Sequence, residues 1–195
     1  MLKAQKYVNI YTEANPNPNS LKFAANFMLV PDGTDFDFAD AQAAKASPLA
    51  ESLFALGYVE RVFIMSNFVT VTKNDSVEWI EISSTIKKMI KEYLEDDRPV
   101  LSQKTMDDYE AASQVPDTEL VKKIKGLLDE YVRPAVESDG GAISFHSYNE
   151  GVVKVQLRGS CSGCPSSTLT LKSGIENLLK RMLPNDVTEV VAEGV

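Results

Sequence analysis

Thiolate and imidazole groups, the usual protein ligands of zinc and other transition metals, are scarce in this sequence, because its 195 residues include only two cysteines and one histidine. No apolar run reaches the roughly 18 residues that a membrane-spanning helix requires, so we expect no membrane contact. The stretch from Met1 to Lys6 lacks the apolar core of a signal peptide and the Arg- and Ser-rich bias of a transit peptide. We therefore expect a cytoplasmic protein, in which cysteines stay reduced and structural disulfides are rare.

An excess of positive charge is also missing. The net charge is −8, with 20 Lys and Arg against 28 Asp and Glu. Residues 95–116 contain six acidic and two basic residues, which is half of that net charge, and neither flank is basic. Because phosphate contacts need clustered Lys and Arg, nucleic-acid binding is disfavoured. The acidic segment also contains Pro99 and Pro116 and shows no hydrophobic period, so it is typical of a flexible linker.

The acidic linker separates two small domains, residues 1–94 and residues 117–195, and both mix helices with strands. The chain is therefore expected to be of the α+β class. Alternation and turn residues predict the strands of the first domain, and helical spacing with an N-cap at Ser47 predicts its helices. The predicted elements of this domain are strands at 7–13, 21–30, 59–65 and 68–73, and helices at 48–56 and 77–94.

The second domain shows the order α-β-β-α-β. Its first helix begins near Asp117, and Pro134 inside the helical pattern predicts a kink or an early end. Two strands follow, joined by a turn at Asn149-Glu150-Gly151, and a last strand over 187–192 comes after the second helix. A three-stranded sheet with both helices on one face is the simplest way to bury these apolar stripes.

Both cysteines lie in one short stretch, Cys161-Ser162-Gly163-Cys164, between a strand-like run over 152–158 and a helix that begins at Pro165. Proline is favoured at the first helical position, which makes Cys164 the expected N-cap. The positive end of the helix dipole would favour thiolate over thiol. Thiolate binds metals and attacks disulfides, so the stretch predicts either half of a metal site or a redox dithiol.

A redox dithiol is the less favoured of these interpretations. Thioredoxin-like proteins also place CxxC between a strand and a helix. Here no tryptophan precedes the motif, because the one tryptophan is Trp79, and the chain after Cys164 is too short for the rest of that sheet.

A metal centre needs about four protein ligands. A lone strand histidine, His146, is more often an ordinary residue than a ligand, so the missing thiolates would come from a second copy of the chain. A zinc-linked dimer is a third alternative.

The second domain resembles a known family in its motifs. Asp139-Gly140-Gly141, the hairpin and the run from Gly159 to Leu169, GSCSGCPSSTL, resemble the C-terminal domain of NifU, found in NifU-like (Nfu) proteins. This match extends from about Asp117 to Val190. Residues 7–94, with the run NPNPNSLKF at positions 15–23, look like the N-terminal domain of Nfu proteins.

The resemblance implies an iron–sulfur cluster carrier rather than an enzyme. It implies that Cys161 and Cys164 ligate a [4Fe-4S] cluster shared across a homodimer, with a [2Fe-2S] cluster left open. Apo iron–sulfur proteins would receive the cluster, upstream assembly proteins would donate it, and the N-terminal domain would dock targets or partners. A CxxC dithiol oxidoreductase remains the alternative. Near the motif, Ser160, Ser162, Ser166 and Ser167 could donate hydrogen bonds to cluster sulfides, although capping or solvent exposure is the simpler interpretation, and Asp139 is interpreted as a turn former.

Overall fold

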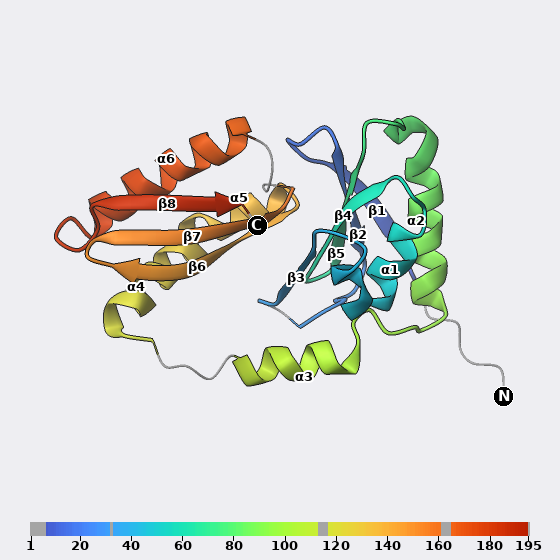
Figure 1. Cartoon of the computed structure of the whole chain (residues 1–195), viewed down its shortest axis with the longest axis horizontal. Helices are drawn as coiled ribbons and strands as arrows, with labels where there is room; N and C mark the ends of the chain where they lie inside the picture. Colours follow the sequence, from blue (N-terminus) through green and yellow to red (C-terminus); the bar gives the residue numbers. More distant parts are fainter. Residues whose placement is uncertain (1–6, 32, 113–116, 161–164, 195) are drawn as a thin grey trace. The chain divides into compact units, whose positions relative to one another are not determined.

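The computed structural model describes residues 7–31, 33–112, 117–160 and 165–194 (Figure 1). The chain divides into two compact units. One contains Met1–Ala14 and Pro18–Gln114, and the other contains Asn15–Asn17 and Val115–Val195. Each unit has its own sheet and its own hydrophobic core. This is the two-domain α+β organisation that the sequence predicts.

A five-stranded antiparallel sheet forms the first unit, in the order β1-β2-β5-β4-β3. The strands are β1 (Ile10–Ala14), β2 (Ser20–Ala25), β3 (Asp35–Phe38), β4 (Val59–Met65) and β5 (Phe68–Lys73). Both strands of the predicted hairpin have the predicted bounds, because β-branched and aromatic residues fill them on either side of a tight turn. Ser66 takes a positive φ of 47° in that turn.

Two helices cover one side of this sheet, α1 (Pro48–Phe54) and α2 (Trp79–Glu95), after a 3-10 turn, η1 (Ala43–Ala46) (Figure 1). The hydroxyl oxygen of Ser47 accepts a hydrogen bond of 3.1 Å from the Ala50 amide, so the predicted N-cap of α1 is confirmed. On α2, Ile82, Ile86 and Ile90 recur at helical spacing and are buried against the sheet. The apolar period of α2 therefore determines which of its faces meets the core.

The acidic segment contains more structure than a flexible linker. Helix α3 (Gln103–Ala112) lies in the stretch where the sequence predicts no regular element. Before it, Leu101 is buried in the first core, and the Ser102 amide donates to the Ala46 carbonyl at 3.0 Å. The hydroxyl of Thr105 donates to the same carbonyl at 2.9 Å. These contacts come from a distant part of the chain, which is why local periodicity missed them. The boundaries at 94 and 116 stay a prediction.

The second unit follows the predicted order. Its elements are α4 (Glu119–Tyr131), α5 (Arg133–Ser138), β6 (Gly141–Asn149), β7 (Val152–Gly159), α6 (Pro165–Met182) and β8 (Glu189–Gly194). The interruption expected at Pro134 is confirmed, because α4 ends at Tyr131 and α5 begins at Arg133, with Val132 between them. The sheet has the order β6-β7-β8, with β6 antiparallel and β8 parallel to the central strand.

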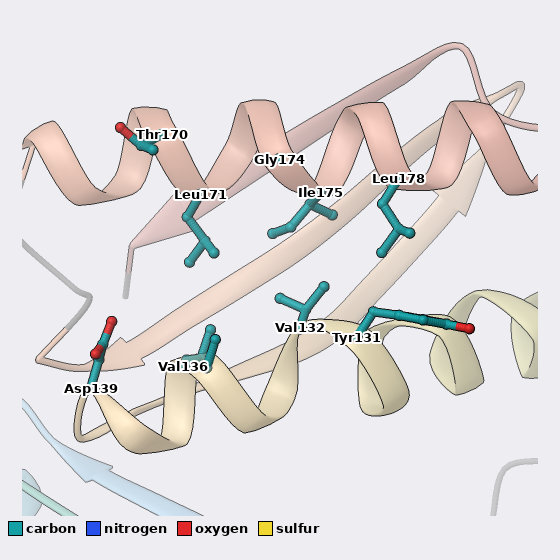
Figure 2. A pocket seen from close by; sticks show the side chains of 10 residues that line it. Tyr131, Val132, Val136, Asp139, Thr170, Leu171, Gly174, Ile175 and Leu178 are labelled. Atoms are coloured by element: carbon teal, nitrogen blue, oxygen red, sulfur yellow. The ribbon is translucent and has the colours of Figure 1, made fainter.

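The core of the second unit lies between its sheet and the helices. It joins Ile124 and Leu128 of α4 and Ile175 and Leu179 of α6 to buried strand residues. The helices share one face of the sheet, as Figure 2 shows for α6 beside the α4–α5 pair with the strands behind them. Within the described ranges, no helix combines the length and the apolar character that crossing a membrane requires.

Candidate metal centre

The predicted ligands Cys161 and Cys164 lie outside the residues that the structure describes, so their role stays a prediction. The chain on either side of them is described. Strand β7 ends at Gly159, and α6 begins at Pro165. The cysteines therefore belong to a short connection between the central strand of the sheet and the longest helix of the second unit.

Ser160 is anchored immediately before the first cysteine. It is 3% exposed, and its hydroxyl donates a hydrogen bond to the backbone carbonyl of Asp139. Its amide donates to the Gly140 carbonyl at 3.4 Å. Gly140 and Gly159 have φ values of 76° and 69°, where a Cβ is disfavoured. The glycines of the DGG and GSC motifs thus let two backbone segments meet at the entry to the cysteine connection.

Helix α6 begins immediately after the second cysteine. Its first residue is Pro165, as the sequence predicts, and its buried residues Ile175 and Leu179 anchor it in the core. The amides of a first helical turn have no partner within the helix and carry partial positive charge. A thiolate at Cys164 would be stabilised by that charge, so α6 favours the form of cysteine that binds metals.

The structure offers no complete metal site elsewhere among the residues it describes. In those ranges, no group of three or more His, Cys, Asp or Glu side chains could hold a metal ion. His146 is exposed on β6, at the point where the pairing with β7 shifts register between Phe145 and Ser147. Its surroundings are those of an ordinary surface histidine, as the sequence interpretation has it.

The structure describes only some of the polar side chains around the cysteine motif. The Ser160 hydroxyl donates its hydrogen to Asp139, so that hydrogen serves the turn rather than a cluster sulfide. Ser162 lies outside the described residues, and so do the side chains of Ser166 and Ser167. Asp139 acts as the C-cap residue of α5, which agrees with its interpretation as a turn former.

Glu176 connects α6 to the edge strand β8. One carboxylate oxygen accepts a hydrogen bond of 2.5 Å from the Lys180 ammonium, and the other accepts one of 3.1 Å from the Val190 amide. These bonds, the Lys180 bond first, lower the pKa of the Glu176 carboxyl below its usual value. The sequence shows the pair through its i, i+4 spacing. It carries no signal for the contact with β8, which sequence reasoning missed.

Comparison with known families gives two matches, one in each unit. The model described as "Scaffold protein Nfu/NifU N terminal" matches residues 10–97. The model described as "NifU-like domain" matches residues 124–191, a range that includes both cysteines. Together the two matches account for most of the chain on either side of the acidic segment.

Curated relatives match both units at once. The chain is 38% identical over 184 residues to "NFU1 iron-sulfur cluster scaffold homolog, mitochondrial" of Drosophila willistoni, covering 94% of this chain and 63% of the relative. It is 42% identical over 176 residues to the protein of the same name from Drosophila persimilis, covering 90% and 62%. A solution structure of a NifU-like protein from Saccharomyces cerevisiae has a TM-score of 0.46 and 27% identity, covering 53% of this chain and 92% of that one.

These relatives correct the expected location. The Drosophila proteins are named mitochondrial, which contradicts the cytoplasmic location expected from residues 1–6. The chain spans less than two thirds of the length of the Drosophila relatives. The composition of its first residues was therefore poor ground for inferring a compartment.

The family assignment rests on the order and the extent of these matches. Each compact unit carries one of the two domains, and relatives with 38% and 42% identity align across both units. The chain thus belongs to the NifU-like Nfu family, with an Nfu N-terminal domain followed by a NifU-like domain.

Proposed function

We propose that this chain is an iron–sulfur cluster carrier that holds a [4Fe-4S] cluster on Cys161 and Cys164. The observation that carries the proposal is the ligand count. Each chain has two cysteines, whereas such a cluster takes about four thiolates. The described residues supply no alternative group of three or more ligands. The names of the Drosophila relatives, which call them iron–sulfur cluster scaffold homologues, support the same function.

Two copies of the chain complete the site in this proposal. A two-fold axis would bring two CxxC connections together and supply four sulfurs to one cluster. The cluster is then cargo rather than a resident cofactor, and the protein turns over no substrate. A site shared by two chains opens when the dimer parts, which suits delivery to an apo-protein.

Transfer in this scheme is ligand exchange. Four bonds from iron to the carrier's cysteines break as four bonds form to thiolates of the recipient. Protons released by the recipient's thiols are taken up by Cys161 and Cys164, and the charge of the cluster core does not change. The chain's own residues position the sulfurs, because Ser160 anchors the entry and the N-terminus of α6 stabilises thiolate at the exit.

Anaerobic reconstitution with iron and sulfide tests the proposal. We expect about four irons and four sulfides per dimer, measured together with the particle mass. Cys161→Ser and Cys164→Ser should each abolish uptake while leaving amide exchange of the second unit unchanged. His146→Ala is the control and should keep the full iron content, because its side chain is exposed. A fully coordinated cluster on a single subunit would overturn the scheme.

The same samples separate the alternatives. About two irons per dimer would indicate a [2Fe-2S] cluster instead. Zinc that survives mild chelation in protein purified without air would indicate a zinc-linked dimer. Turnover in insulin reduction that requires both cysteines, without cluster uptake, would indicate a dithiol oxidoreductase.

A further inference from the structure

A groove runs between α5 and α6 in the second unit (Figure 2). Its volume is about 710 Å³, within the range of roughly 300–1,000 Å³ typical of binding pockets. Most of its lining is apolar. The lining residues are Tyr131, Val132, Ala135, Val136 and Asp139 on the α4–α5 side, and Thr170, Leu171, Gly174, Ile175 and Leu178 on α6.

The groove is long enough to hold about two turns of a helix, and the apolar residues on its α6 wall lie at helical spacing. Leu171, Ile175 and Leu178 stand at i, i+4 and i+7 on the α6 wall, and Figure 2 shows Leu171 and Val136 pointing toward one another from opposite walls. At 1.5 Å per residue, Leu171 and Leu178 are about 10 Å apart along the axis, or two turns. A Cβ added at Gly174 would meet nothing within 4 Å, so this wall is open to a partner at its middle. Helices that dock in grooves present apolar residues at this spacing.

The charge of the groove is concentrated at one end. Asp139 is the one charged residue of the lining, and Figure 2 shows it at the end of α5 that faces the start of α6. Among the residues that the structure describes, none pairs with its carboxylate. The hydroxyl of Tyr131, at the far end, hydrogen-bonds the Glu130 carboxylate, which raises the pKa of Tyr131 above its usual value. The groove therefore complements a Lys or Arg side chain at its Asp139 end.

The acidic end of the groove adjoins Ser160, the residue before Cys161 in the sequence. The backbone carbonyl of Asp139 accepts a hydrogen bond from the hydroxyl of Ser160. On the opposite wall, Thr170 and Leu171 belong to the early turns of α6, which begins immediately after Cys164. A partner seated in the groove would thus bring its basic end to Asp139, beside Ser160 and the early turns of α6.

We propose that this groove docks a helix of the recipient apo-protein. That helix has two turns in contact, apolar residues at i, i+4 and i+7, and a Lys or Arg at the end that meets Asp139. This inference rests on the carrier function proposed above and names how its partner is held. A second copy of the chain fits less well, because stable dimers bury roughly 1,600 Å² in total, more than a two-turn groove supplies.

A stapled helical peptide tests the docking directly. The probe carries leucines at i, i+4 and i+7 and a lysine one turn beyond them, and a second probe has glutamate in place of that lysine. Binding to the full chain without cluster is followed by amide chemical shifts and by fluorescence anisotropy. We expect shifts at the groove lining and about tenfold weaker binding of the glutamate probe. Asp139→Lys should reverse this preference.

Two exposed helical glycines provide a matched pair of variants. Gly174 lines the groove and Gly126 on α4 does not, and a Cβ at either position would meet nothing within 4 Å. Gly174→Leu fills the groove and should weaken binding of the lysine probe by about tenfold or more. Gly126→Leu should bind the probe like the original chain, which controls for the loss of a helical glycine.

Transfer to a synthetic acceptor connects docking to delivery. The acceptor is a four-cysteine peptide that takes up a [4Fe-4S] cluster, with or without the lysine-bearing helix attached. We expect the attached helix to speed transfer from the loaded chain about tenfold, and Gly174→Leu to remove that gain. An equal gain with Gly174→Leu, or peptide binding that this variant leaves unchanged, would overturn the proposal.

The remaining outcomes separate this proposal from the one on which it rests. Failure of all probes to bind would overturn the groove assignment while the cluster content stands by itself. Dissociation of a cluster-free dimer by Gly174→Leu would assign the groove to a second copy and overturn recipient docking. Peptide binding without any cluster uptake would reject the carrier function and leave the groove as a helix-docking site.

Discussion

The two units stabilise themselves with cores of different size and composition. Among the described residues, the first core contains 22 buried residues, including Phe23, Phe36, Phe38 and Tyr93. The second core contains 12, and all of them are Val, Leu or Ile. Aromatic side chains bury more area than aliphatic ones, and hydrophobic stabilisation grows with buried area. We therefore expect the unit that carries the cysteines to have the smaller margin of stability.

This difference indicates which unit should open more readily. Low-stability regions are where proteins open and rearrange. In the second unit, the edge strand β8 pairs with one neighbour and is held to α6 by Glu176. If the chain delivers a cluster as proposed, a site whose cargo must leave is well placed on such a unit.

The largest expected effect is the loss of a buried leucine from the smaller core. Leu179→Ala removes a side chain of α6 that is 0% exposed. We expect the free energy of unfolding of the second unit to fall by about 2–5 kcal/mol. Amide exchange should then show the second unit opening while the first stays protected. Leu169→Ala on the same helix is the control, because Leu169 is 68% exposed and its loss should change stability by less than about 0.5 kcal/mol.

A matched change in the larger core sharpens the comparison. Ile86→Ala on α2 removes a side chain that is 0% exposed and should also cost about 2–5 kcal/mol. Because the first core is larger, we expect this unit to remain folded at room temperature, as measured by urea titration. Ile80→Ala is the control on the same helix, since Ile80 is 90% exposed. Unfolding of the first unit by Ile86→Ala, with the second intact after Leu179→Ala, would reverse our ranking.

Helix caps give a smaller effect that again differs between the units. Ser47 is 0% exposed and holds two partners, the Ala50 amide and the Val100 carbonyl. Ser47→Ala should cost about 2 kcal/mol, because both partners lose their bond away from water. Thr118→Ala removes an exposed cap of α4, bound to the Val121 amide at 3.3 Å, and should cost about 0.5 kcal/mol. If thermal unfolding showed the same loss of stability for both variants, burial would not determine how much each cap stabilises its unit.

The smallest expected effect depends on pH and belongs to the second unit. The Lys180 and Val190 hydrogen bonds lower the pKa of Glu176 from the model-compound value of 4.5. The stability from these bonds is therefore fully present above that value and is lost as pH falls through the lower pKa of the folded state. Glu176→Gln should remove this acid-range dependence. Lys180→Met should move the Glu176 pKa back toward 4.5, which a carboxyl NMR titration measures directly.

Local patterns predicted much of the fold for a physical reason. The hairpin β4–β5, the cap at Ser47 and the start of α6 at Pro165 depend on neighbouring residues, and the sequence shows those neighbours. Helix α3 was missed because Leu101 and Thr105 are stabilised by residues of η1 and the first core, far away in the sequence. For the candidate site, the motif named Cys161 and Cys164, which the described residues do not test.

By itself, the sequence determined the number of sulfur ligands per chain, the order of elements in the second unit and the apolar faces of its helices. Composition and periodicity are enough to predict these features, because each depends on the residue types present or on residues that are neighbours along the chain. Tertiary structure alone decided that Ser160 binds Asp139, that Glu176 holds β8 and that α5 and α6 leave a groove between them. Such contacts join residues that are distant along the chain, and they exist only once the helices have packed on the sheet.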